Sequence, residues 1–154
     1  MPGYFGYEAG QSCVGDHFAW FVENCVPESY EQEARVRGIS IHQLLSEKLS
    51  TYKAGASGLL ALDWFNGVRT PLMDFNLNGL IMGMNLLTKP EEIYLSLIEA
   101  TAYGTRMIIE GFEEAGLEVK DITLSGGIPI KNEMLVQVYS DAVSYTHLTL
   151  PTIA

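Results

Sequence analysis

Basic residues are scarce in this chain. Its 154 residues include 9 lysines and arginines against 19 aspartates and glutamates, so the formal net charge is −10. A surface of that sign repels the phosphate backbone of DNA and RNA. The sequence also contains no cluster of basic side chains that could follow a polyanion. We therefore expect no nucleic-acid partner.

Cysteines and long apolar runs are also few. The two cysteines, Cys13 and Cys25, form no CxxC pair and are too few for a disulfide framework. No apolar run reaches membrane-spanning length, and the N-terminus lacks the basic flank and apolar segment of a signal peptide. These features predict a cytoplasmic protein with reduced thiols and no membrane partner.

Apolar material for a core is present. Hydrophobic residues make up 47% of the chain and charged residues 18%, a balance typical of folded domains rather than disordered chains. The length suits one domain. Short apolar runs of the kind found in buried strands occupy 59–62 and 119–124. Apolar residues at helical spacing occupy 14–25, 41–52, 90–116 and 131–143. This alternation predicts the α/β class.

Several residues mark where the predicted helices begin and end. Ser12, Ser40 and Thr88 stand where N-caps are expected, since their side-chain oxygens can accept from free N–H groups. Pro90 suits a first helical position and Gly116 a C-terminal stop. The charged stretch 28–37 indicates a solvated helix or a linker.

A pair of glycines, Gly126 and Gly127, follows the apolar run 119–124 and precedes the helical pattern that begins at Lys131. Glycines let a ligand approach the backbone, and the start of a helix offers free N–H groups. The segment is neither a Walker A loop nor a GxGxxG fingerprint. Taken alone, a glycine pair before a helix is a structural turn more often than a nucleotide site.

A second candidate site lies near the N-terminus, where Glu8 and Gly10 precede a predicted helix. The Glu8 carboxylate could accept hydrogen bonds from two sugar hydroxyls at once, which suits a polyol. The alternative is a capped helix with an exposed Glu8. Asp63 ends a predicted strand, where side chains can face a cleft, but Asp63 and Arg69 could equally form a local ion pair.

The remaining reactive side chains indicate no further site. His17 and His42 lack Cys, His or Asp partners at metal-ligand spacing, so we expect no metal-binding residues in the chain. Cys13 lies near a predicted helix start, which would lower the pKa of its thiol, but no base is near it in sequence. No Ser-His-Asp signature is present.

Five segments in order resemble one family. They lie at 3–16, 58–70, 79–99, 98–106 and 125–132. The second includes Leu62-Asp63-Trp64-Phe65-Asn66-Gly67, and the last is Ser125-Gly126-Gly127 with Lys131-Asn132. Together they resemble the ribulokinase branch of the FGGY carbohydrate kinases, over residues 2 to about 142.

The resemblance implies a fold and a reaction. The fold would be an incomplete actin-like (ribonuclease H-type) ATPase domain in the C-terminal half of a sugar kinase, spanning 1–142. The reaction would be phosphorylation of L-ribulose to L-ribulose 5-phosphate in arabinose catabolism, with ATP and Mg²⁺ as cofactors. The alternatives are a related kinase with xylulose or rhamnulose as its substrate, or a non-catalytic actin-like nucleotide-binding module. Homo-oligomerisation stays open.

The resemblance also assigns residues. Glu8 would contact the sugar substrate. The nucleotide would be bound by Gly10, Gly126, Gly127, Lys131 and Asn132. The family's catalytic base would lie upstream of this segment, so no catalytic residue is expected in the chain, and we expect the chain alone to be inactive. Val68 occupies a position that is often polar in the family.

The last residues break the pattern. Residues 144–154 lack the helical period of the preceding segment, and 143–152 resemble a translated sequencing adapter. We expect this tail to be non-native, so that His147 has no functional role. The alternative is a genuine short C-terminal strand.

Overall fold

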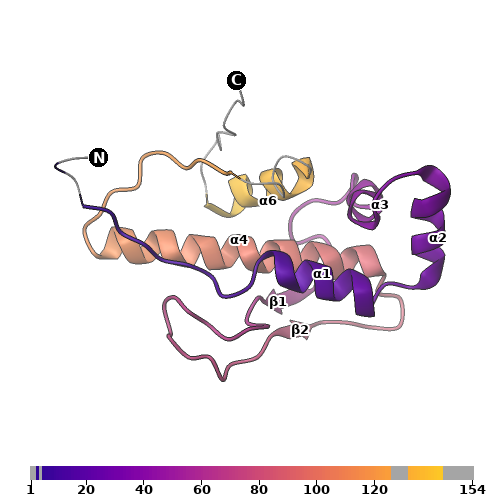
Figure 1. The fold of residues 1–154 in the computed structure, drawn as a ribbon, viewed down its shortest axis with the longest axis horizontal. Helices are drawn as coiled ribbons and strands as arrows, with labels where there is room; N and C mark the ends of the chain where they lie inside the picture. Colours follow the sequence, from indigo (N-terminus) through magenta and orange to yellow (C-terminus); the bar gives the residue numbers. More distant parts are fainter. Residues whose placement is uncertain (1–2, 4, 126–131, 144–154) are drawn as a thin grey trace.

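The computed structural model describes residue 3, residues 5–125 and residues 132–143. Three short helices come first, followed by two short strands, a long helix and a last helix (Figure 1). The elements are α1 (Gly15–Asn24), α2 (Glu28–Arg37), α3 (Ile41–Lys48), β1 (Leu60–Leu62), β2 (Leu80–Met82), α4 (Pro90–Glu114) and α6 (Glu133–Val143). The α/β prediction is confirmed, and the charged stretch 28–37 is a helix.

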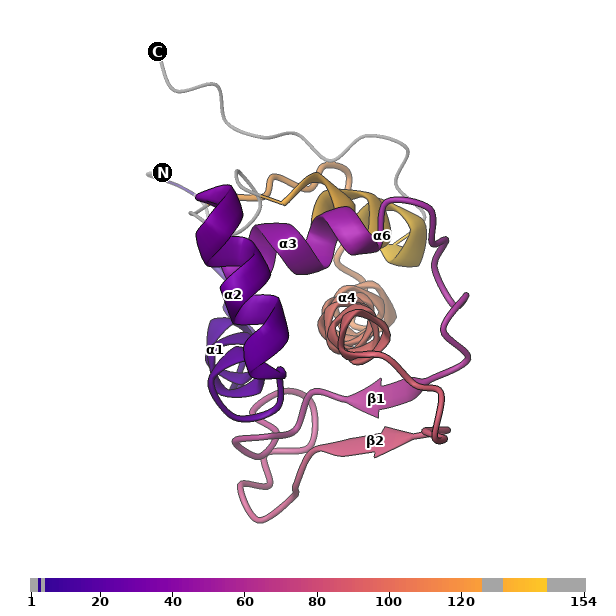
Figure 2. The same cartoon turned by 90° about the vertical axis from the view of Figure 1, so that its right-hand side faces the viewer.

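The long helix α4 is the centre of the molecule. Viewed along its axis, α1 and α2 lie on one side, α3 and α6 above it and the two strands below it (Figure 2). Every residue from Tyr94 to Ala102 is buried. A helix that is buried all round needs apolar or hydrogen-bonded side chains on every face. The run Leu95, Leu97, Ile98, Ala100 and Ala102 supplies them.

The ends of α4 follow the sequence signals in part. Pro90 is its first residue, and Gly116 follows its end with a φ of 83°. The prediction of Thr88 as N-cap is wrong, because Lys89 is the cap residue and its backbone N–H donates to Glu92 Oε2 at 2.7 Å. The Thr88 hydroxyl instead accepts from Asn85 N–H, so it stabilises the preceding turn.

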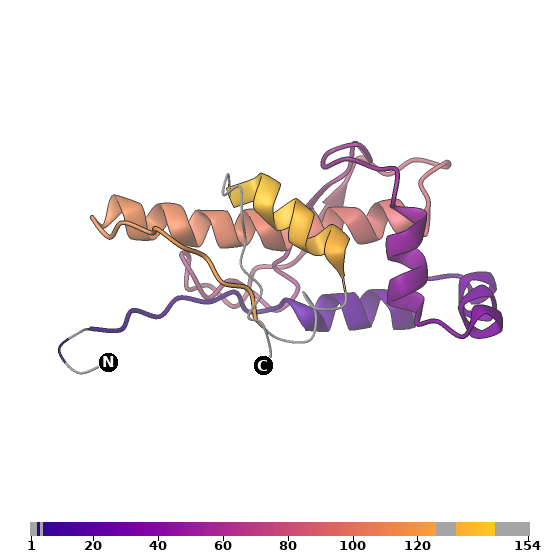
Figure 3. The same ribbon diagram turned by 90° about the horizontal axis from the view of Figure 1, so that it is seen from above.

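The first helix begins later than the sequence predicts. It starts at Gly15 with Val14 as its cap residue and no side-chain cap, so Ser12 is not an N-cap. The prediction for Ser40 is confirmed, since its hydroxyl accepts from Gln43 N–H at 3.1 Å. Seen from above, α6 crosses α4 obliquely, while the segment before α1 runs on in the direction of α4 (Figure 3).

The two strands form one antiparallel pair, with Ala61 opposite Ile81. The prediction of a buried strand at 59–62 is only half right: Ala61 faces α4 and is buried, whereas Leu60 is about half exposed. Only one face of the pair is covered, so alternate residues meet solvent. The run 119–124 forms no regular strand within the part of the chain that the structure describes, where only Thr123 takes part in an isolated bridge.

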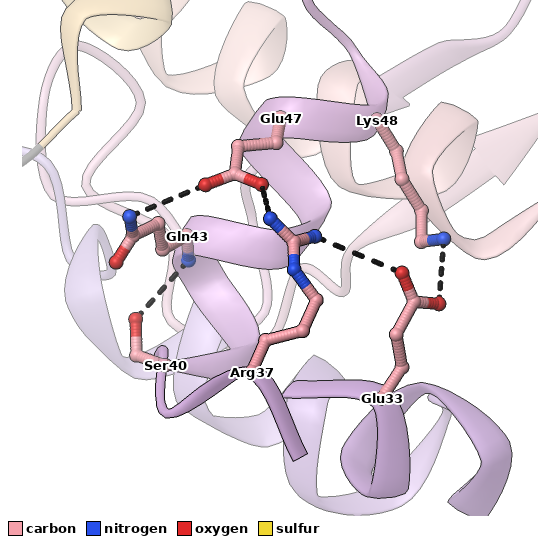
Figure 4. Close-up of polar contacts among 6 residues, drawn as sticks. All are labelled: Glu33, Arg37, Ser40, Gln43, Glu47 and Lys48. Carbon is pink, nitrogen blue, oxygen red and sulfur yellow. Dashed lines mark hydrogen bonds and ion pairs between the residues drawn. The ribbon is translucent and has the colours of Figure 1, made fainter. Parts of the chain in front are cut away.

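Helices α2 and α3 are joined by charged side chains (Figure 4). Arg37 pairs with Glu47 at 2.5 Å, and Lys48 pairs with Glu33 at 2.8 Å. Gln43 completes the network by donating to Glu47. Most of these side chains are roughly 40% exposed, so solvent screens them. None of the helices described here is both long and apolar enough to cross a membrane.

Candidate functional site

The Gln11 side chain joins three parts of the molecule that are distant in sequence. Its Nε2 donates to Asp63 Oδ2 at 2.7 Å and to the Thr101 carbonyl oxygen at 2.9 Å. Its Oε1 accepts from the Thr105 hydroxyl at 3.1 Å. Asp63 follows β1 and both threonines lie on α4, so one amide connects the N-terminal segment, the strand pair and the central helix.

Asp63 is the charged group at the base of this cluster. The side chain is buried, and burial raises the pKa of its carboxyl, while the Gln11 hydrogen bond acts in the opposite direction. A buried carboxylate without a donor is costly, so the Gln11 amide compensates for its burial. The alternative of a local Asp63–Arg69 ion pair is wrong, because Arg69 pairs with Glu8 instead.

A glycine makes room for the cluster. A Cβ at Gly104 in α4 would overlap Gln11 Nε2 and lie 3.0 Å from Asp63 Oδ2. The glycine therefore has a packing reason to stand inside a helix, where it is otherwise unfavourable.

The residues just before Gln11 are held by the loop after β1. The Arg69 Nη2 lies 3.0 Å from Glu8 Oε1, and the Gly10 N–H donates to the Thr70 hydroxyl at 3.3 Å. The Glu8 side chain is 79% exposed, so its carboxylate is accessible to a ligand. Glu8 and Gly10, which the resemblance assigned to sugar and nucleotide, thus lie together against one loop.

A cavity of about 160 Å³ opens beside this segment. Its wall is mostly apolar and includes Leu60, Leu72 and Met107, with Asp63 and Gln11 among its polar groups. The Ser12 hydroxyl oxygen, in the same wall, has no hydrogen-bond partner in the described part of the chain. Such a mixture of apolar wall and a few convergent polar groups is typical of small-molecule sites.

The other predicted nucleotide residues are placed only in part. Gly126, Gly127 and Lys131 lie outside the described residues. Asn132 is buried directly before α6, and its Oδ1 accepts from Leu135 N–H at 3.1 Å. That oxygen therefore caps α6.

Neither histidine nor Cys13 forms a reactive centre. Burial lowers the pKa of His17 to about 4 and raises the pKa of the Cys13 thiol, so the expectation of a lowered thiol pKa is wrong. The His17 ring packs on Phe18 and Phe65. The Leu97 and Cys13 backbones lie near its nitrogens, but neither nitrogen has a hydrogen bond of good geometry in the described part of the chain.

His42 accepts from or donates to Tyr94 Oη at 3.0 Å. Three or more His, Cys, Asp or Glu side chains that could hold a metal ion come together nowhere in 5–125 or 132–143.

Sequence reasoning missed Gln11, Thr70 and Thr105. Gln11 was adjacent to Gly10 but carried no signal of its own, because its partners lie 52, 90 and 94 positions away. The sequence does indicate Asp63 by its place at a strand end, and Asp63 lies in the cluster.

Solved structures with the same fold are sugar kinases. The xylulose kinase from Rhodospirillum rubrum superposes with a TM-score of 0.71 at 22% identity, covering 86% of this chain and 25% of that one. The glycerol kinase from Plasmodium falciparum, solved with ADP, gives a TM-score of 0.64 at 20% identity, covering 86% of this chain and 24% of its own. The fold is therefore that of the C-terminal part of such kinases.

Sequence comparison gives the family. Residues 1–152 match the family model described as the C-terminal domain of the FGGY family of carbohydrate kinases, so this chain belongs to that family. The ribulokinase of Bacillus licheniformis is 56% identical over 144 residues, and that of Anoxybacillus flavithermus 54%. Each alignment covers 94% of this chain and 26% of the relative. The predicted resemblance to ribulokinases is confirmed.

Proposed function

We propose that this chain is part of an ATP-dependent kinase that phosphorylates L-ribulose at O5. The observation that carries the proposal is the 56% identity with a ribulokinase over 94% of the chain. The xylulose kinases of the same fold are only 18–23% identical. The chain spans about a quarter of the length of the curated relatives it matches, so the activity is proposed for the whole protein.

In the proposed reaction the sugar hydroxyl oxygen attacks the γ-phosphorus of ATP. The bond from γ-phosphorus to the β–γ bridging oxygen breaks, ADP leaves, and the hydroxyl proton passes to a base outside this chain. Reactions of this kind depend on positioning and on neutralising charge. The role of this chain is to hold the sugar by the exposed Glu8 carboxylate and the nucleotide by Gly10, Gly126, Gly127, Lys131 and Asn132.

The residues present fit an ATP–Mg²⁺ complex. Mg²⁺ bound to a nucleotide is held mainly by phosphates and water, with one or two carboxylates, so a three-ligand protein cluster is not required. Beside Gly10 the Arg69 guanidinium, which pairs with Glu8 at 3.0 Å, lies 3.4 Å from where a Cβ would stand. We propose that this guanidinium also contacts a phosphate group, since arginine binds phosphates well.

A chimera tests the proposal. Residues 3–142 replace the matching segment of the Bacillus licheniformis ribulokinase, which supplies the remaining parts of the enzyme. We expect ADP release to depend on L-ribulose. With D-xylulose or L-rhamnulose, kcat/KM should be at least tenfold lower, a difference of roughly 1.4 kcal/mol. Preference for either of those ketoses would reassign the substrate, and nucleotide binding without turnover would support the non-catalytic module.

Three further expectations belong to the same proposal. We expect the whole protein to be cytoplasmic and to act in arabinose catabolism, and it could form homo-oligomers.

Residues 143–154 are proposed to be a non-native tail. Val143, the first of them, is buried at the end of α6, and residues 144–154 lie outside the described part. The genomic DNA that follows codon 142 tests this. If it encodes a sequence other than residues 143–154, the tail is non-native, and if it encodes these residues, the proposal is wrong.

A further inference from the structure

The segment that carries Glu8 and Gly10 belongs to no helix or strand. Residues 5–11 have neither a helical nor a ladder hydrogen-bond pattern to fix their path. Their position therefore depends on side-chain contacts. Among the described residues three such contacts are present: Arg69 to Glu8, Thr70 to Gly10, and the Gln11 amide to α4 and Asp63.

These contacts differ in strength. The Arg69–Glu8 pair is exposed, with 52% and 79% of the side chains accessible, and such pairs contribute little. The Thr70 contact is a single hydrogen bond at 3.3 Å. Gln11, in contrast, uses both of its N–H donors and its oxygen, and one partner is a buried carboxylate. Hydrogen bonds to charged groups are the stronger ones.

We infer that Gln11 is a positioning residue, which fixes the segment so that the Glu8 carboxylate stands where the sugar binds. The inference rests on the proposed function, since it takes Glu8 as the sugar contact. Only Ala9 and Gly10 separate the two side chains, so a shift of the Gln11 backbone moves Glu8 with it. Gly104 and Asp63 act through Gln11: the glycine leaves room for the amide and the carboxylate accepts from it.

The test uses the chimera described above and steady-state kinetics. Gln11→Ala should raise the KM for L-ribulose about tenfold, a change of roughly 1.4 kcal/mol, and should raise the KM for ATP much less. Gln11→Met, close in volume, serves if the alanine variant fails to fold. Gln43→Ala is the matched control, because that amide lies on the α3 surface and bonds only to exposed groups.

A double variant separates positioning from general damage. If Gln11 acts through Glu8, then Gln11→Ala adds little to the KM for ribulose once Glu8→Gln is present. Independent effects that multiply would overturn the inference. So would a ribulose KM within about twofold of the parent in Gln11→Ala and Gln11→Met, provided that Glu8→Gln raises it. If Glu8→Gln itself changes nothing, the proposed sugar contact fails and the inference fails with it.

Discussion

At the scale of single residues, Gly104 decides whether the Gln11 amide fits against α4. An added Cβ would overlap Gln11 Nε2, and overpacking of this kind costs about 1–3 kcal/mol. We predict that Gly104→Ala lowers the free energy of unfolding of the chimera by about that amount, measured by urea denaturation.

The same helix offers the control for this prediction. Gly111 is an exposed residue of α4, and nothing lies within 4 Å of an added Cβ there. Gly111→Ala should raise the free energy of unfolding by about 0.5–1 kcal/mol, because alanine is the better helix former. Equal effects of the two substitutions would show that Gly104 has no packing role.

A second residue-scale prediction concerns His17. Burial lowers its pKa to about 4, whereas an unfolded chain has a value near 6.5. Between these values the unfolded state takes up a proton that the native state does not. The contribution of neutral His17 to the free energy of unfolding is therefore fully present above pH 6.5. It is lost as the pH falls toward 4, by on the order of 3 kcal/mol.

The variant His17→Phe isolates this effect, since it keeps a ring between Phe18 and Phe65 but cannot titrate. We expect urea denaturation of the chimera at pH 7 and pH 5 to show a smaller acid loss in the variant. Parallel losses in both proteins would mean that His17 titrates normally.

The residues of the site were predictable only where local sequence carried the signal. Glu8 and Gly10 stood out as a carboxylate and a glycine before a helix, and Asp63 as the end of a strand. Gln11 did not stand out, because a glutamine gains its role from partners that only the fold brings near. Thr105, 94 residues away from it, shows the same limit.

At the scale of elements, α3 is held by its apolar face rather than by its charges. Leu45 is fully buried in the core, whereas Arg37 and Glu47 are about 40% exposed. We predict a loss of about 2–5 kcal/mol for Leu45→Ala and below about 1 kcal/mol for Arg37→Ala. Thermal unfolding of the chimera in low and high salt checks both.

Salt distinguishes the two contributions. Raising the ionic strength should remove most of the Arg37 effect and leave the Leu45 effect unchanged, because screening acts on exposed charges. An Arg37→Ala effect as large as that of Leu45→Ala would contradict this ranking.

Helices were more predictable from the sequence than strands. The apolar spacing of α4 and α6 and the cap at Ser40 are local, so they can be seen in one segment. A strand is completed by its neighbour, and 119–124 has the composition of a strand without becoming one in the described structure. For the same reason the exposed face of β1 was not foreseen.

At the scale of the whole molecule, the strand pair leaves apolar side chains uncovered. Leu80 and Met82 of β2 are at least half exposed, and Leu86 and Leu87 in the following loop are almost fully exposed. A two-stranded sheet is marginal in water, and an exposed apolar edge favours association. We predict that the isolated 154-residue chain shows no cooperative thermal transition by circular dichroism. A sharp, reversible transition would contradict this.

The central claim is that the segment before α1, anchored by Gln11 on Asp63, presents Glu8 to the sugar. A crystal structure of the chimera with L-ribulose bound tests it most directly. We expect a Glu8 carboxylate oxygen about 2.7 Å from a ribulose hydroxyl, with the Gln11–Asp63 hydrogen bond intact. Ribulose bound elsewhere, with Glu8 still paired to Arg69 in solvent, would contradict it.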